Sequence, residues 1–110
     1  MATKDPREPF TRISVAEAKE MMGNGAVVID VRETHEYTGG HVPNAGHIPV
    51  NTVYARREEL PKDKELIFVC ALGQRSALAA EMAAAAGLTQ LYNLEGGTEA
   101  WIKSGEAVEK

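Results

Sequence analysis

Apolar residues in this chain gather in short runs separated by polar and glycine-containing segments. Two runs, residues 26–31 and 65–69, are nearly continuous rather than alternating, and the first is rich in β-branched residues. Such runs are typical of strands that are covered on both faces of a parallel sheet. A further strand is predicted over residues 91–94. Residues 47–48 leave room for one very short strand among the surrounding turn residues.

Helical signals occupy the segments between these runs. Ser14 and Glu17 have the spacing of a capping box, which predicts that a helix follows Ser14 and ends near residues 23–25. Further helical segments are predicted over residues 33–38, over residues 53–60 with an end before Pro61, and over residues 98–103.

The alanine-rich segment 76–86 predicts the clearest helix. Leu78, Met82 and Ala85 are spaced to share one face, and Gly87 stands where a left-handed residue commonly ends a helix. Strands that alternate with helices over this length predict a small α/β domain. We expect a mainly parallel sheet flanked by helices on both faces.

Length and composition agree with one domain. The chain has 110 residues, 44% of them apolar and 25% charged, which is ordinary for a soluble globular protein. We therefore expect a single domain over residues 1–110. Residues 1–9 are charged and proline-containing, which predicts an extended lead-in, with Phe10 and Ile13 as its anchors to the core.

Charge and cysteine content exclude several classes of protein. A net charge of −4 gives no basic surface for nucleic acid, and no segment has the apolar length of a membrane span or a signal peptide. The single cysteine cannot form an internal disulfide. We therefore expect a cytoplasmic protein without nucleic-acid or membrane partners. The scattered histidines and carboxylates have no metal-ligand spacing, so we expect neither a metal nor another cofactor.

Cys70, the only cysteine, follows the predicted strand 65–69 and precedes a glycine-containing loop and a helix. A thiol in this position faces backbone N–H groups and the positive end of a helix dipole, and both favour the thiolate. The strand context by itself favours an inert buried cysteine.

The loop after Cys70 favours a reactive thiol instead. Gly73 can adopt a positive φ and let the backbone curl around an anion, and Arg75 offers a planar fork for an oxyanion. A glycine and an arginine after a strand are common, however, and Arg75 could equally be a solvated charge near a helix start. The spacing alone therefore leaves both interpretations open.

The Cys-x4-Arg loop, with Ser76 after it, resembles the active-site loop of rhodanese-like sulfurtransferases. Further segments agree with that family in order and spacing, so that the resemblance covers residues 13–105. These segments are residues 28–32 (Val-Ile-Asp-Val-Arg), 36–37 (Glu-Tyr), 40–45 (Gly-His-Val-Pro-Asn-Ala), 47–49 (His-Ile-Pro), 94–97 (Leu-Glu-Gly-Gly) and 100–101 (Ala-Trp). Asn44 stands where the family commonly has glycine, and asparagine tolerates a left-handed φ.

The resemblance implies a thiosulfate sulfurtransferase, or rhodanese, that uses a covalent persulfide. Cys70 would take sulfane sulfur from thiosulfate or a persulfide donor and pass it to cyanide or a thiol, with small molecules or proteins as partners. Cys70 would be the catalytic residue. The substrate-binding loop would comprise Ala71, Leu72, Gly73, Gln74, Arg75 and Ser76.

Two alternatives stay open. Cysteine phosphatases and arsenate reductases of related fold also use a cysteine, an amide cradle and an arginine, but their loops resemble Cys-x5-Arg, one residue longer than the loop here. A non-catalytic binding module of the same fold would not need Cys70.

Residues near the loop have structural interpretations. We expect His41 and His47 to make hydrogen bonds and His35 to lie on the surface. Asp30 and Arg32 are expected to form part of the scaffold, paired with each other or with Glu36 and His41.

Overall fold

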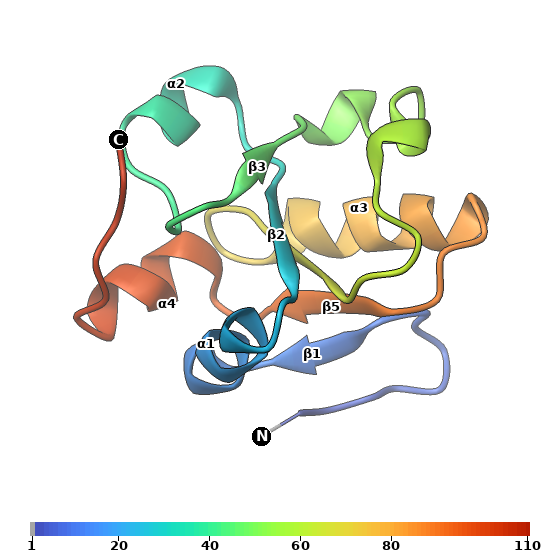
Figure 1. Ribbon diagram of the computed structural model, residues 1–110, viewed down its shortest axis with the longest axis horizontal. Coiled ribbons are helices and arrows are strands. Elements are labelled where there is room, and N and C mark those ends of the chain that lie inside the picture. Colours follow the sequence, from blue (N-terminus) through green and yellow to red (C-terminus); the bar gives the residue numbers. More distant parts are fainter. Residues whose placement is uncertain (1) are drawn as a thin grey trace.

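A five-stranded parallel sheet forms the centre of the computed structural model, which describes residues 2–110 (Figure 1). The strands lie in the order β1-β5-β4-β2-β3. Their bounds are β1 (Thr11–Ile13), β2 (Val27–Asp30), β3 (Gly46–His47), β4 (Leu66–Val69) and β5 (Leu91–Leu94). Because every pair is parallel, the carboxyl ends of the strands share one edge of the sheet. β4 is the central strand, so the residue after it lies in the middle of that edge.

Helices cover both faces of this sheet, as the pattern of apolar runs predicts. Their bounds are α1 (Val15–Gly23), α2 (Thr34–Thr38), α3 (Gln74–Ala85) and α4 (Gly97–Lys103). Successive residues of β4 point to opposite faces. Leu66 and Phe68 share a core cluster with the alanines of α3, whereas Ile67 and Val69 pack with residues of α1 and α4, among them Trp101. The predicted fold class is confirmed.

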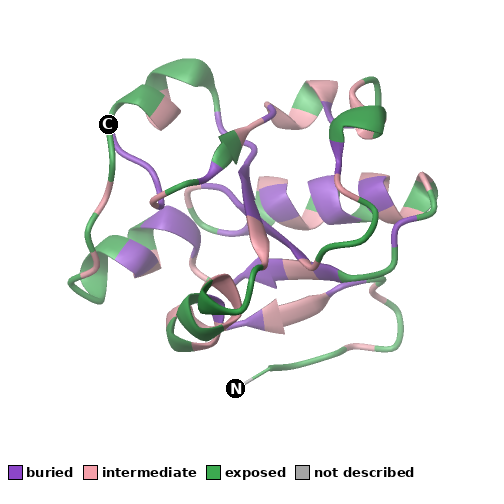
Figure 2. Cartoon of the chain, viewed as in Figure 1, coloured by how far each residue is buried: buried purple, intermediate pink, exposed green. Residues whose placement is uncertain are grey.

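The buried face of α3 differs from the predicted one. Figure 2 shows buried and exposed stretches along α3. Its buried residues are Ser76, Ala79, Ala80 and Ala83, and Leu78 is exposed. The face predicted from Leu78, Met82 and Ala85 is therefore not the buried one, since Leu78 and Ala85 are exposed and Met82 is only partly buried. Small alanines let the helix approach the sheet more closely than a leucine would. The helix also begins at Gln74, two residues earlier than predicted, so that Arg75 and Ser76 lie in its first turn.

Two further segments depart from the predictions. Residues 53–60 do not form an α-helix; short 3₁₀ helices η1 (Val50–Thr52) and η2 (Arg57–Glu59) flank a turn there. Val53 and Leu60 are buried, and because so short a segment has little helical stability of its own, its docking into the core decides its shape. Strand β1 was not predicted, since its three residues carry no pattern of their own and are held by pairing with β5.

The local predictions agree with the structure elsewhere. The capping box of Ser14 and Glu17 is present, and Phe10 and Ile13 are buried. Asn44 adopts the expected left-handed conformation, with a φ of 66°. Residue 1 of the predicted lead-in lies outside the described residues. Within residues 2–110, no helix is long and apolar enough to cross a lipid bilayer.

Candidate active site

Cys70 directly follows β4 and lies beneath the loop that leads into α3. Its side chain is buried, with an exposed fraction of 1%. The backbone N–H of Gly73 donates a hydrogen bond to Cys70 Sγ at 3.1 Å, and Ser76 Oγ lies 3.4 Å from the sulfur. Gly73 allows this curl because its φ is +114°, in the region that glycine adopts at little cost. The loop thus wraps its donors around the thiol.

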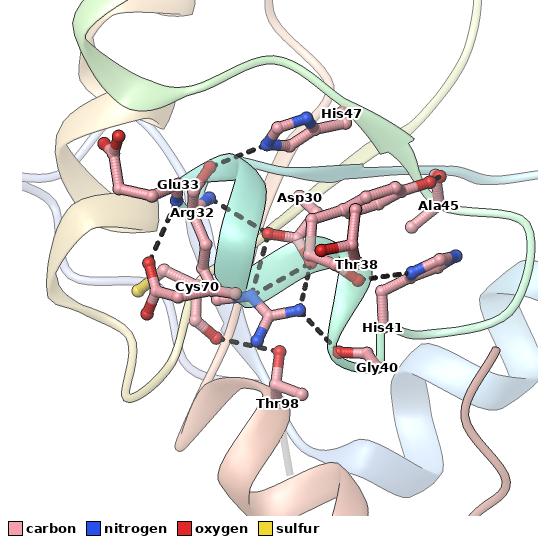
Figure 3. Close-up of polar contacts among 12 residues, drawn as sticks. Asp30, Arg32, Glu33, Thr38, Gly40, His41, Ala45, His47, Cys70 and Thr98 are labelled. Atoms are coloured by element: carbon pink, nitrogen blue, oxygen red, sulfur yellow. Dashed lines mark hydrogen bonds and ion pairs between the residues drawn. The ribbon is translucent and has the colours of Figure 1, made fainter. Parts of the chain in front are cut away.

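The start of α4 holds the loop in this orientation. The backbone N–H and the hydroxyl of Thr98 donate to the carbonyl oxygen of Cys70 at 2.8 and 3.1 Å (Figure 3). The N–H of Glu99 donates to the carbonyl of Ala71 at 3.1 Å. A carbonyl and the N–H of the same peptide unit point in opposite directions. Because the carbonyl of Ala71 faces α4, the N–H of Leu72 is directed away from α4, on the side from which it lowers the pKa of Cys70.

Opposing effects set the pKa of the Cys70 thiol. Burial raises this pKa, because it disfavours the charged form. Hydrogen bonds from the Ser76 hydroxyl and from the backbone N–H groups of Ser76, Gly73 and Leu72 lower it, and together they outweigh burial. The pKa of Cys70 therefore lies below its ordinary value, which favours the nucleophilic thiolate.

Arg75 joins the loop to α2. Its guanidinium donates to both carboxylate oxygens of Glu36, at 2.8 and 3.0 Å. This ion pair lowers the pKa of Glu36 to about 2, although partial burial opposes the shift. The pKa of Arg75 is raised, first by Glu36 and to a smaller extent by Cys70. Arg75 therefore braces the loop through its fork and also brings positive charge near the sulfur.

Asp30 and Arg32 form a buried ion pair next to the site (Figure 3). Arg32 Nη2 donates to Asp30 Oδ2 at 2.8 Å and to the carbonyl of Gly40 at 2.8 Å. Of the pairings that the sequence left open, the structure has these two residues paired with each other. They tie the end of β2 to the segment after α2, which is the scaffold role that we expected.

The three histidines have the surroundings that we expected. His41 Nδ1 lies 2.8 Å from the carbonyl oxygen of Tyr37, and His47 Nε2 lies 2.7 Å from that of Arg32. The Tyr37 ring stacks on both imidazoles, with centroid distances of 3.8 and 4.5 Å. His35 is exposed. Among residues 2–110, no group of three His, Cys, Asp or Glu side chains could hold a metal ion.

Asn93 is a site residue that the sequence analysis missed. It lies on β5 beside β4, where it is in register with Phe68, and it is fully buried. Its side-chain Nδ2 donates to the carbonyl of Gly73 at 3.2 Å, and its Oδ1 accepts from Ser76 Oγ at 2.5 Å. The signal was present, because a buried apolar strand contains an amide only when that amide has partners to satisfy.

The predicted substrate-binding residues divide between the inside and the outside of the loop. Gly73 and Ser76 are buried beside Cys70, Ala71 and Arg75 are partly buried, and Leu72 and Gln74 are exposed. The outer side of the loop lines an open pocket of about 450 Å³. Its lining residues are Arg12, Leu72, Gly73, Gln74, Ala77 and Glu95. Arg12 and Glu95 are paired across it at 2.9 Å.

Comparison with known proteins places this geometry in a family. The rhodanese-like domain matches residues 14–104. Thiosulfate sulfurtransferase GlpE of Ectopseudomonas mendocina is 35% identical over 92 residues, which cover 84% of each chain. The crystal structure of a rhodanese-related protein from Thermoplasma volcanium has a TM-score of 0.82 and 34% identity over 89% of this chain and 96% of that one.

One further structure bears on the phosphatase alternative. A protein of unknown function from Rhodopseudomonas palustris, described as a possible tyrosine phosphatase, has a TM-score of 0.79 and 26% identity over 99% of both chains. The rhodanese-like domain nevertheless matches residues 14–104, and a thiosulfate sulfurtransferase is 35% identical to this chain. Both findings agree with the rhodanese-like pattern of the Cys70 loop. The chain belongs to the rhodanese-like domain family.

Proposed function

We propose that this protein is a thiosulfate sulfurtransferase that carries sulfane sulfur as a persulfide on Cys70. The observation that carries the proposal is the buried Cys70 sulfur, which accepts from the N–H of Gly73 at 3.1 Å and lies 3.4 Å from Ser76 Oγ. The N–H groups of Leu72 and Ser76 also lower its pKa. Donors already in place around a buried sulfur stabilise its negative charge without rearranging during the reaction. The likeness to the thiosulfate sulfurtransferase GlpE supports the same reaction.

In the first half-reaction, the Cys70 thiolate attacks the outer sulfur of thiosulfate. A sulfur–sulfur bond forms to Cys70, the sulfur–sulfur bond of thiosulfate breaks, and sulfite leaves with the bonding electron pair. Cys70 then holds an anionic persulfide. Because the negative charge moves to the added sulfur, the same loop donors stabilise both the starting thiolate and the product. No general base is needed when the thiolate has already formed.

In the second half-reaction, a thiophilic acceptor attacks the outer sulfur of the persulfide. With cyanide the products are thiocyanate and the Cys70 thiolate. With a thiolate acceptor the sulfur leaves as a new persulfide. The acceptor would approach over Leu72 and Gln74, which are the exposed residues of the loop. This open approach suits small anions as sulfur donors, and thiols of small molecules or of proteins as acceptors.

The experiment is intact mass spectrometry of the purified protein after exposure to thiosulfate. We expect a gain equal to one sulfur atom, its loss on addition of cyanide, and neither change in Cys70→Ala. Since the chain has one cysteine, the added sulfur has only one thiol to occupy. Absence of the adduct with thiosulfate and with low-molecular-weight persulfides would overturn the proposal.

A cysteine phosphatase is the second candidate, favoured by the likeness to the possible tyrosine phosphatase of Rhodopseudomonas palustris. Two features count against it. The loop has four residues between Cys70 and Arg75, where the phosphatase pattern has five. The guanidinium of Arg75 is engaged by Glu36, whereas a phosphatase arginine must bind the phosphoryl group. Turnover of a phenyl phosphate ester that depends on Cys70, without any persulfide, would favour this candidate.

A further inference from the structure

Ser76 stands between two hydrogen-bond acceptors. Its Oγ lies 3.4 Å from Cys70 Sγ and 2.5 Å from Asn93 Oδ1, and all three side chains are buried. A serine hydroxyl carries one proton. Ser76 can therefore donate either to the sulfur or to the amide oxygen, but not to both at once.

The amide of Asn93 has only one favourable orientation. Its Nδ2 donates to the carbonyl oxygen of Gly73 and to Glu95 Oε2, both at 3.2 Å. Each of these oxygens is an acceptor, so a rotated amide would set oxygen against oxygen on that side. Arg12 in turn holds the Glu95 carboxylate at 2.9 Å. The Oδ1 atom consequently faces Ser76, where it accepts the hydroxyl proton.

We propose that Asn93 is a positioning residue that holds the hydroxyl proton of Ser76 while Cys70 is a thiol and releases it to the sulfur when the thiolate forms. In the thiol state, Cys70 S–H donates to Ser76 Oγ and the Ser76 hydroxyl donates to Asn93. When Cys70 loses its proton to solvent, the hydroxyl rotates toward Sγ and joins the N–H of Gly73. No bond between heavy atoms forms or breaks.

Asn93 thereby controls the ionisation of Cys70 without touching it. Rotation of the Ser76 hydroxyl leaves the buried Oδ1 of Asn93 without a donor, and an unsatisfied buried acceptor is costly. This cost opposes formation of the thiolate. The inference deepens the proposed function, on which its catalytic meaning rests, because it concerns the ionisation of the same nucleophile.

The charged groups around this trio are paired with one another. They are Arg75 of α3 with Glu36 of α2, Arg12 of β1 with Glu95 after β5, and Arg32 with Asp30 at the end of β2. Substitutions of Ser76 touch none of these six side chains, and substitutions of Asn93 remove one hydrogen bond to Glu95, which Arg12 still holds. A change in the titration midpoint of Cys70 in such variants therefore measures the effect of the Ser76 hydroxyl and the Asn93 side-chain amide.

The test is a titration of the Cys70 thiolate by its ultraviolet absorbance, which is unambiguous in a chain with one cysteine. Asn93→Leu removes the competing acceptor, so we expect a lower midpoint and about three- to tenfold more thiolate at a fixed pH below it. Asn93→Asp keeps the acceptor at Oδ1 and sets its second oxygen against the Gly73 carbonyl and Glu95. Negative charge on this side chain opposes the thiolate, so we expect a higher midpoint. Opposite shifts at one position cannot both arise from partial unfolding.

A double-mutant cycle tests whether Asn93 acts on Cys70 through the Ser76 hydroxyl. In a Ser76→Ala background, Asn93→Leu should no longer move the midpoint, because the hydroxyl through which Asn93 acts is gone. An undiminished shift in that background, or shifts of the same sign for Asn93→Leu and Asn93→Asp, would overturn the proposal. If Asn93→Leu does not unfold cooperatively, Asn93→Ala takes its place in the cycle. The titration contains no sulfur donor, so its outcome is independent of whether the persulfide forms.

Discussion

Arg75 and Glu36 form a bidentate ion pair, at 2.8 and 3.0 Å, that ties the first turn of α3 to α2. The two residues lie 39 positions apart in the chain. The pair occupies the planar fork that could otherwise bind a substrate oxyanion. Arg75 therefore has two separable roles, since its geometry holds the loop and its charge acts on Cys70.

Substitution of Arg75 separates these two roles. Arg75→Lys keeps the charge but loses the bidentate geometry, so we expect the Cys70 pKa to stay low while the protein loses about 1 kcal/mol of stability. Arg75→Ala should lose the same stability and also raise the Cys70 pKa. The rate of alkylation against pH measures the pKa, and denaturant unfolding measures stability. If the lysine variant titrated like the alanine variant, the charge would have no role of its own.

The same ion pair predicts a loss of stability in acid. The pKa of Glu36 is about 2 in the folded protein, below its ordinary value of 4.5. A carboxyl group with a lowered folded-state pKa stabilises the fold above its unfolded pKa, and this contribution is lost progressively as the pH falls below about 4.5 and through about 2. Both side chains keep some contact with solvent, so we expect about 1 kcal/mol.

Glu36→Gln is the matched variant for this prediction. It should be less stable than the parent protein at neutral pH, and the difference should shrink as the pH falls below about 2, where Glu36 itself becomes protonated in the folded protein. Denaturant unfolding at a series of pH values measures the difference. A difference that did not change with pH would mean that Glu36 stabilises the fold through packing rather than charge.

Gly97 is where α4 and the Cys70 loop approach most closely. A Cβ atom at this position would lie 2.3 Å from the carbonyl oxygen of Cys70 and 2.6 Å from that of Ala71. Both are backbone atoms that hydrogen-bond to α4, so they cannot move without opening the loop. We expect Gly97→Ala to cost more than about 3 kcal/mol and to abolish sulfur transfer, as thermal unfolding and the persulfide assay would show.

Gly87→Ala provides the control for that substitution. Gly87 also has a positive φ, +97°, but a Cβ there would meet nothing within 4 Å. Backbone strain alone should therefore cost about 1 kcal/mol, with no effect on the rate of persulfide formation. Equal losses in the two variants would contradict the steric argument for Gly97.

Gly73→Ala tests the N–H that donates to the sulfur. A Cβ at Gly73 would make only ordinary contacts, at 3.7 Å or more, but its φ of +114° strains an alanine. Relief of that strain would turn the peptide and move the donor away from Cys70 Sγ. We expect persulfide formation to slow by about a hundredfold, on the order of an oxyanion-hole deletion, and the Cys70 pKa to rise. An unchanged rate would show that this donor is dispensable.

Much of the fold was predictable because its signals are local. The capping box of Ser14 and Glu17 involves residues of a single turn, and the apolar run of β4 needs no knowledge of its neighbours. The direction of Arg75 was not predictable in this way, since the carboxylate that holds it comes from another helix. Leu78 was misplaced because the choice of buried face on α3 depends on how closely the sheet approaches.

The sequence by itself determined the alternating α/β organisation, the position of Cys70 at a strand end and the resemblance to the rhodanese-like family, because these depend on periodicity and on short motifs. Only the tertiary structure decided which partners surround the thiol. Asn93, Thr98 and Glu36 reach the loop from β5, α4 and α2, and their roles exist only once parallel pairing has brought the carboxyl ends of distant strands to one edge. Hydrogen bonds and ion pairs require contact within a few ångströms, and no local pattern records which distant residues will make it.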